Sequence, residues 1–389
     1  MSIRGGYGIY YDRTLNGIFE QNSFTNPPFV GSAVSQPTAP LNSFDNATQG
    51  STIPLGPIGV HGTGTPNFKV PYNQQWSFSV QREIMPNTLF EVAYVGSKGT
   101  HLLGIFDPNE VSLPVRTANP AAQANAIRPY LGYNAGSTIG TEFNSNYNSL
   151  QISLNRRMSH GLNLGVAYTW AQTLTNNPSD RSDAPYNTYN FAADYGPASF
   201  SVGQDLIINY VYDLPFFRSQ QGLAGHLLGG WEVSGITTFQ QGFPTTIYQY
   251  FDPFDSTFFP GVPGTYPGGI GTDLGGPVTA RPDRLSLTAG PGTVAEYINT
   301  ASFKDAAGHF GNSGRGVVIG PGLNNWDIAG IKNIKISERF NMQFRAEFFN
   351  AFNHPSFNSF DNFTDDPAFG QLNGDYQPRI IQFGLKLFF

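Results

Sequence analysis

Cysteine is absent from the 389-residue sequence. Disulfide bonds, thiolate nucleophiles and cysteine-ligated zinc sites are therefore excluded. Charged residues are also scarce, since they make up 12% of the chain, about half the share found in ordinary soluble domains. The net charge is −6, whereas proteins that bind nucleic acid carry a basic face. We therefore expect no nucleic-acid partner.

Long apolar runs are missing as well. No stretch approaches the roughly 18 consecutive apolar residues of a membrane-spanning helix, and no export signal precedes the strand-like residues that begin at Ile3. Aromatic residues, in contrast, make up 14% of the chain, which also holds 45 glycines and 29 prolines. This composition is rich in turns but too apolar and aromatic for a disordered chain.

Apolar and polar residues alternate along many short segments, which is the pattern of β-strands with two different faces. After Trp76, for example, Phe78 and Val80 continue one face of a strand. The pattern predicts about ten strands, each near the 9–11 residues that a tilted strand needs to cross a bilayer. The expected strands lie at or around residues 3–11, 76–80, 90–94, 150–154, 162–170, 206–214, 231–241, 326–336, 342–350 and 380–389.

The connections between these segments alternate between long and short along the chain. The longest span residues 12–72, 97–146 and 242–325, and short turns stand between them, for example at 85–88 and 157–161. An up-and-down membrane barrel with short periplasmic turns and long external loops has this rhythm, whereas a Greek-key sandwich has no reason for it. We therefore predict an all-β fold, an antiparallel transmembrane β-barrel domain over residues 1–389, in the bacterial outer membrane.

In such a barrel the apolar face of each strand contacts lipid and the polar face lines the interior. A charged side chain that faces lipid costs about 2–4 kcal/mol at the bilayer midplane. We therefore expect Gln343, Arg345 and Glu347 to face the lumen, with an interior ion pair favoured over substrate contact. The side chains expected to face lipid are Phe78, Val80, Ile152, Val166 and Phe344.

Aromatic residues stand near the ends of many expected strands, among them Tyr11, Trp76, Trp170 and Trp231. Membrane barrels carry aromatic girdles at both interfaces because amphipathic rings suit the headgroup region. The alternative is that aromatic residues are simply common in all strands.

No catalytic constellation is visible, and we predict neither an enzyme nor a metal or cofactor site. The six histidines are dispersed, and the glycine-rich segment 311–316 lacks the lysine of a phosphate-binding loop. Acidic loop residues could bind calcium through oxygen ligands, but none shows the twelve-residue ligand spacing, so solvated turn carboxylates are favoured. These acidic residues are Asp252, Asp255, Asp361, Asp365 and Asp366.

Several segments resemble Oar-like TonB-dependent receptors, which are large outer-membrane proteins abundant in Acidobacteria and related groups. The strongest similarity is the sequence QFRAEFFNAFNH at residues 343–354. Further similar segments are 147–154, 156–157, 159–162, 167–170, 210–216, 230–239 and 320–322, with Asn325 and Asp327.

The resemblance implies the barrel wall of a TonB-dependent outer-membrane transporter for an unidentified bulky ligand. A complete family member would carry a plug and a barrel of about 22 strands. We therefore expect this chain to be the C-terminal segment of a wider barrel, with TonB contacts made only through N-terminal regions that it lacks. The alternatives are a plugless porin-like pore and a surface adhesin or structural protein.

The last residues also match a signal for barrel assembly. Leu385, Leu387 and Phe389 alternate along the final expected strand, which ends on a terminal aromatic residue. We expect this strand to be recognised by the barrel-assembly machinery, although an ordinary closing strand would have the same pattern. The expected partners are therefore outer-membrane lipid and that machinery.

Overall fold

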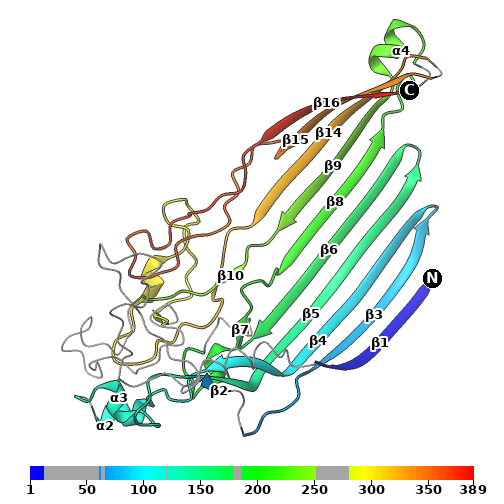
Figure 1. Cartoon of the computed structure of the whole chain (residues 1–389). Helices are drawn as coiled ribbons and strands as arrows, with labels where there is room; N and C mark the ends of the chain where they lie inside the picture. Colours follow the sequence, from blue (N-terminus) through cyan, green and yellow to red (C-terminus); the bar gives the residue numbers. More distant parts are fainter. Residues whose placement is uncertain are drawn as a thin grey trace, which may run out of the picture.

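Ten long strands lie side by side in one antiparallel sheet whose order follows the chain (Figure 1). The computed structural model describes residues 1–12, 61–62, 66–119, 121–177, 185–218, 220–250, 280–337 and 339–389. The ten strands are β1 (Ser2–Tyr11), β3 (Tyr72–Met85), β4 (Thr88–Phe106), β5 (Ser137–Ser159), β6 (Leu162–Thr175), β8 (Gln204–Asp213), β9 (Trp231–Gln240), β14 (Leu323–Lys335), β15 (Asn341–Phe349) and β16 (Ile380–Phe388). The predicted strands and their up-and-down order are confirmed.

The two ends of the sheet differ in their connections. One end of the sheet, here called the turn end, holds both chain termini and the shorter connections (Figure 1). These connections are β3–β4, β5–β6, β8–β9 and β14–β15. Two of these turns use left-handed backbone, at Asn87 (φ 62°) and at His160–Gly161 (φ 53° and 82°), which tight hairpins require. The long connections lie at the opposite end, here called the loop end.

Two central strands are longer than the sequence pattern predicts. β4 has 19 residues and β5 has 23, against the expected 9–11, so the connection between them covers residues 107–136 rather than 97–146. Their pairing continues past two irregularities, between Thr100 and Leu102 and between Leu102 and Gly104. A left-handed backbone at His101 (φ 57°) lies inside this irregular stretch. The irregularities break the period-two alternation, which is why the sequence pattern ends the strands too early.

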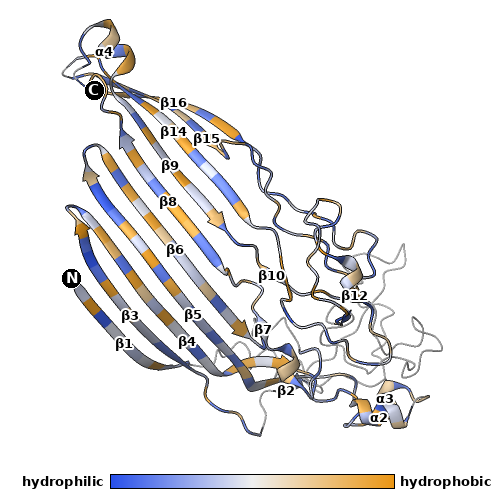
Figure 2. Ribbon diagram, turned by 180° about the vertical axis from the view of Figure 1, so that it is seen from behind, coloured by the Kyte–Doolittle hydropathy of each residue, from blue (hydrophilic) through white to orange (hydrophobic). Residues whose placement is uncertain are grey.

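The strand register divides the side chains between two faces, because directly paired residues of neighbouring strands share a face. Val80 pairs with Val92, Val92 with Ile152, and Ile152 with Tyr168. Following such pairs across the sheet places one set of residues together on what we call the apolar face: Phe78, Val80, Ile152, Val166 and Phe344. Gln343, Arg345 and Glu347 occupy the opposite, polar face. Figure 2 shows the resulting alternation of hydrophobic and hydrophilic residues along the strands.

No described residues form a protein layer over the apolar face of the outer strands. Phe383 and Leu385 on β16 are each 66% exposed, and Leu387 is 60% exposed. Among the described residues, nearly all buried apolar side chains lie instead at the loop end, with Ile331 on β14 as the exception. The sheet is therefore a wall and not one layer of a packed sandwich.

The sheet is open, with β1 and β16 at its two edges (Figure 1). The described parts of the connections hold three short α-helices, α2 (Leu113–Ala118), α3 (Ala124–Ile127) and α4 (Gly222–Leu228). In the described part of the chain, no helix has the length and apolar character needed to cross a membrane.

Candidate functional site

The long connections pack against one another at the loop end and form an ordered layer, here called the loop layer. It comprises residues 107–119, 121–136, 185–203, 241–250, 280–322 and 350–379. One apolar cluster joins Val111 and Ala124 to Phe310 of a distant connection. A second cluster centres on Ile247, Ile298 and Phe360, which again come from two connections.

Hydrogen bonds also join neighbouring connections of the loop layer. The Thr188 amide donates to a carboxylate oxygen of Glu110 (3.0 Å), and the Tyr189 hydroxyl donates to the Glu110 carbonyl (2.7 Å). The amide of Gly311 donates to the Tyr186 hydroxyl (3.1 Å). Because these bonds link segments far apart in the sequence, the connections hold one another in place.

A buried charge cluster centred on Asp194 stabilises the middle of the layer. Asp194 is 1% exposed, and its Oδ1 pairs with Arg281 and lies 3.5 Å from Nη2 of Arg315. Its Oδ2 accepts a hydrogen bond from the Tyr186 amide (2.9 Å), and the Arg281 guanidinium lies over the Tyr186 ring, 5.2 Å from its centroid. One carboxylate thus ties together residues of two connections.

Arg281 remains charged in this buried position. Burial lowers the pKa of Arg281 from 12.5 to about 10, and the positive charge of Arg315 lowers it as well. A pKa near this value still leaves the guanidinium protonated at neutral pH, so the contact with Asp194 is an ion pair.

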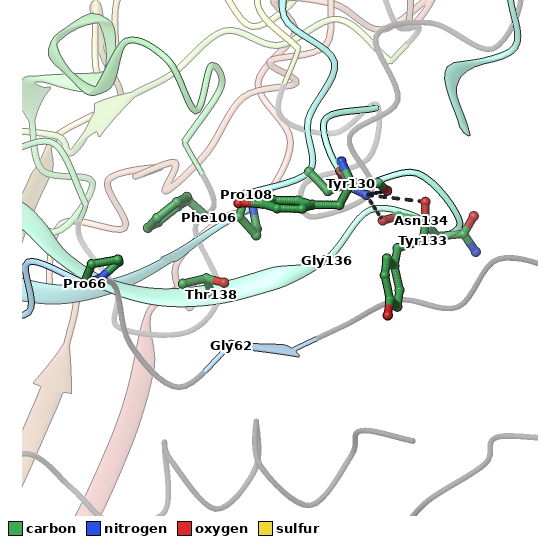
Figure 3. Close-up of a pocket in the computed structure, with 10 residues that line it drawn as sticks. Gly62, Pro66, Phe106, Pro108, Tyr130, Tyr133, Asn134, Gly136 and Thr138 are labelled. Carbon is green, nitrogen blue, oxygen red and sulfur yellow. Dashed lines mark hydrogen bonds between the residues drawn. The ribbon is translucent and has the colours of Figure 1, made fainter. Parts of the chain in front are cut away.

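A pocket of about 480 Å³ opens beside β2 (His61–Gly62), where the ends of β4 and β5 rise into the loop layer (Figure 3). The lining residues that the structure describes include no charged side chain. Aromatic rings, prolines and amides form the walls, and the lining residues are Gly62, Pro66, Phe106, Pro108, Asn109, Tyr130, Tyr133, Asn134, Gly136 and Thr138. Such a surface suits an uncharged ligand that stacks on rings and exchanges hydrogen bonds with amides.

Asn109 holds the tyrosine-bearing wall of this pocket. Its Nδ2 donates to the backbone carbonyls of Tyr130 (3.2 Å) and Asn134 (2.8 Å), and its Oδ1 accepts from the Tyr130 amide (2.7 Å). The buried Asp107–Arg128 pair (3.6 Å) supports Asn109 from behind, since Arg128 donates to the Asn109 carbonyl (3.0 Å). The charges therefore lie behind the pocket wall and shape it without lining it.

Replacing Asn109 with alanine is expected to loosen the turn at residues 130–134 by about 1–3 kcal/mol, because buried backbone groups lose their partners. Hydrogen exchange should show faster exchange of the Tyr130 amide. The matched control is Asn119→Ala, because Asn119 belongs to the same connection but its side chain donates to the Val115 carbonyl (2.9 Å) and not to the turn. Unchanged exchange at Tyr130 in Asn109→Ala would contradict the assigned role.

The polar residues singled out on β15 do not belong to the loop layer. Arg345 and Glu347 form an ion pair (2.7 Å) with side chains that are 45% and 22% exposed. Gln343 donates to Oδ1 of Asn333 (2.8 Å). These contacts join neighbouring residues of the polar face, while the lumenal position of that face stays a prediction.

Of the acidic loop residues that the structure describes, Asp361 and Asp366 cap turns, and Asp365 joins two connections. Asp361 accepts from the Phe363 amide (3.1 Å), Asp365 from the Tyr250 amide (2.9 Å) and Asp366 from the Ala368 amide (2.7 Å). Asp252 and Asp255 lie outside the described residues. Within the described ranges, no group of three or more His, Asp or Glu side chains is arranged to hold a metal ion.

The sequence pattern pointed to neither the Asp194 cluster nor the pocket. Asp194 and Arg281 are 87 positions apart and follow no motif. Asn109 and Tyr130 lie in a segment without periodicity. Their only advance signal was the unusual length of the connections, since long loops without elements of their own are commonly functional.

Comparison with known proteins identifies the family. The family model of the outer membrane beta barrel domain matches residues 1–382. No curated protein is similar to the chain. Among solved structures, the outer membrane transporter YddB from Escherichia coli matches at 11% identity with a TM-score of 0.50, over 99% of this chain and 38% of YddB.

Two further solved structures are more distant. The ferric-catecholate import receptor Fiu from E. coli K12 shares 9% identity at a TM-score of 0.40, over 99% of this chain and 32% of Fiu. The siderophore receptor PiuA from Acinetobacter baumannii shares 8% identity at a TM-score of 0.41, over 82% of this chain and 28% of PiuA. The chain thus spans less than two fifths of the length of these proteins.

The matched family agrees with the ten-stranded antiparallel wall, its exposed apolar face and its long external loops. The chain belongs to the outer-membrane β-barrel domain family and is a protein of the bacterial outer membrane.

Proposed function

We propose that the chain forms part of the wall of a TonB-dependent outer-membrane transporter, of the Oar-like type, whose loop layer contacts a bulky ligand. The observation that carries this proposal is an ordered loop layer with an uncharged pocket, placed on a membrane wall of the matched family. A simple pore needs no such layer, because its selectivity comes from the lumen.

The lining of the pocket supports one class of ligand. Phe106, Tyr130 and Tyr133 offer ring faces for stacking, and the Asn109 amide fixes their wall through its bonds to the backbone of Tyr130 and Asn134. A charged ligand would leave its charge without a partner there, at a large desolvation penalty. An uncharged ligand with hydroxyl groups and apolar ring faces, such as an oligosaccharide, matches this lining.

The proposal includes a role for each face of the sheet. The apolar face would contact lipid, which is the environment that its exposed phenylalanines and leucines favour. The polar face would line the lumen, where water or neighbouring polar groups solvate the Arg345–Glu347 pair.

The partners follow from the same proposal. The plug and N-terminal regions of the whole protein would make the TonB contact. Leu385 and Leu387 lie on the apolar face beside Phe344 and Met342, and Phe389 follows them as the terminal residue. This aromatic-ended strand would be the segment that the barrel-assembly machinery binds.

The proposal predicts that Tyr130→Ala lowers ligand uptake about tenfold or more, the effect of losing one stacking contact worth about 1–3 kcal/mol. Uptake of radiolabelled neutral oligosaccharides by cells that express the protein would measure it, with and without a functional TonB system. Tyr195→Ala is the matched control, because Tyr195 is an exposed tyrosine of the loop layer outside the pocket.

The outcomes separate the candidate functions. Uptake that needs both Tyr130 and TonB supports the transporter. Uptake that is independent of both indicates a porin-like pore, and cell attachment that is lost in Tyr130→Ala without any uptake indicates an adhesin.

A further inference from the structure

A buried lysine stands on the apolar face near the turn end, where an unshielded charge would meet lipid. Lys332 on β14 is 6% exposed, and the register places it between Trp231 and Phe344 on that face. Its Nζ donates to the backbone carbonyls of Leu227 (3.3 Å) and Gly229, at the C-terminal end of α4. Helix C-terminal carbonyls carry partial negative charge and therefore stabilise the ammonium group.

Trp231 makes a second tie to the same helix end. Its Nε1 donates to the Leu227 carbonyl (3.0 Å), and the ammonium nitrogen of Lys332 lies 5.4 Å from its ring centroid. Because both side chains extend from the apolar face, the C-terminal end of α4 must lie on that side of the sheet. Figure 1 places α4 at the turn end, next to the C-terminus.

The α4 segment is fixed to the sheet by its backbone neighbours as well. Gln220 donates through Nε2 to the Asn333 carbonyl (3.0 Å) and accepts from the Lys335 amide (3.2 Å). The Asn333 amide in turn donates to the Gly230 carbonyl (2.8 Å). The helix is therefore an anchored element with a defined orientation.

This anchored helix nevertheless presents large apolar side chains to its surroundings. Leu223 and Leu227, one helical turn apart, are 82% and 63% exposed, and Leu228, Phe216 and Phe217 are exposed beside them. On the same side of the sheet, Phe383 and Leu385 of β16 are exposed as well. This composition matches that of segments that lie in a membrane interface. It combines a tryptophan, several leucines and a lysine whose charge is satisfied by carbonyl groups.

We propose that α4, with Phe216 and Phe217, is an interfacial anchor whose leucines lie in the periplasmic leaflet of the outer membrane. The proposal rests on the assignment of the apolar face to lipid. It explains why a lysine occupies that face: the carbonyls of α4 cap the ammonium, and α4 in turn covers it against the acyl chains.

Single cysteines carrying a nitroxide label can test this, since these 389 residues contain no cysteine of their own. Labels at Leu223→Cys and Leu227→Cys would be measured in outer-membrane fragments from cells that express the protein. Collision with oxygen reports lipid, and collision with a water-soluble nickel chelate reports solvent. Phe383→Cys on the apolar face is the lipid reference, and Arg339→Cys in the β14–β15 turn is the solvent reference at the same end.

Both helix labels are expected to match Phe383, with oxygen collisions several-fold above the Arg339 reference and little collision with nickel. Nickel access equal to that at Arg339, while Phe383 stays protected, would overturn the anchor and leave the lipid face intact. Shielding from both reagents would indicate a protein partner and also overturn it. Nickel access at Phe383 itself would remove both the face assignment and the anchor.

Discussion

Val166→Arg is expected to lower the free energy of membrane folding by about 2–4 kcal/mol, the penalty for an arginine at the lipid-facing midplane of a barrel. Val166 lies within β6 opposite Ile208, which is in the middle of β8, and its paired neighbours Leu154 and Ile208 are apolar. A guanidinium there has no acidic partner across either pairing. Folding titrations of the purified protein into lipid vesicles, monitored by tryptophan fluorescence, measure this free energy for the variant and the unchanged protein.

Thr169→Arg is the control on the same strand. Thr169 lies on the polar face, where it pairs with Gln151 and Asp205, so an arginine there gains an acidic neighbour. The change is expected to cost less than about 1 kcal/mol, because a lumenal charge stays solvated. Equal penalties for the two variants would show that the two faces are not divided between lipid and lumen.

Asp194→Asn is expected to destabilise the loop layer locally by about 3–5 kcal/mol, because it leaves two buried arginines without their shared carboxylate. Arg281 and Arg315 would then repel each other, at positions where neither is open to water. Hydrogen exchange should accelerate about a hundredfold or more at the Tyr186 and Gly311 amides, since each 1.36 kcal/mol corresponds to a factor of ten.

Glu347→Gln is the matched control for this charge. The Arg345–Glu347 pair is partly exposed, at 45% and 22%, and pairs of this kind contribute about 0–1 kcal/mol. Its exchange rates should therefore stay close to those of the unchanged protein. Loop-layer protection that survives Asp194→Asn would mean that the apolar clusters around Val111 and Ile247 stabilise the layer without the ion pair.

The strands could be predicted from sequence because their order depends on a local signal. Phe78 and Val80 alternate with serines, and a period of two fixes the face of every residue in a strand. The alternation of long and short connections then predicted the antiparallel order, because in an up-and-down barrel each strand pairs with the next strand in the chain. The pattern failed only beyond Thr100, where irregular pairing lets β4 and β5 continue without alternation.

The loop layer and α4 could not be predicted because their contacts are not local. Asp194 meets Arg281 and Arg315 through the fold, and each is an ordinary polar loop residue in the sequence. α4 has seven residues with a glycine at its start and another inside, too short to form without tertiary contacts. The rule that charges avoid the lipid face would put Lys332 on the polar face. The structure shows Lys332 on the apolar face, where the carbonyls at the end of α4 accept from its ammonium group.

The open edges of the sheet raise the question whether these ten strands form a barrel alone or belong to a wider barrel. Among the described residues, β1 pairs only with β3, and β16 only with β15. An edge strand exposed in lipid leaves backbone groups unpaired, at several kcal/mol each. The ten strands must therefore either close on themselves or be bonded to further strands.

The decisive measurement is the distance between spin labels on the two edge strands, at Arg4→Cys of β1 and Lys386→Cys of β16, in native outer membranes; both positions lie near the turn end and on the polar face. In a wall that forms part of a barrel of about 22 strands, spaced about 4.8 Å apart, the account predicts a separation on the order of 40 Å. A separation of about 10 Å or less, the distance between labels on paired strands, would show that the ten strands close on themselves and would contradict the account.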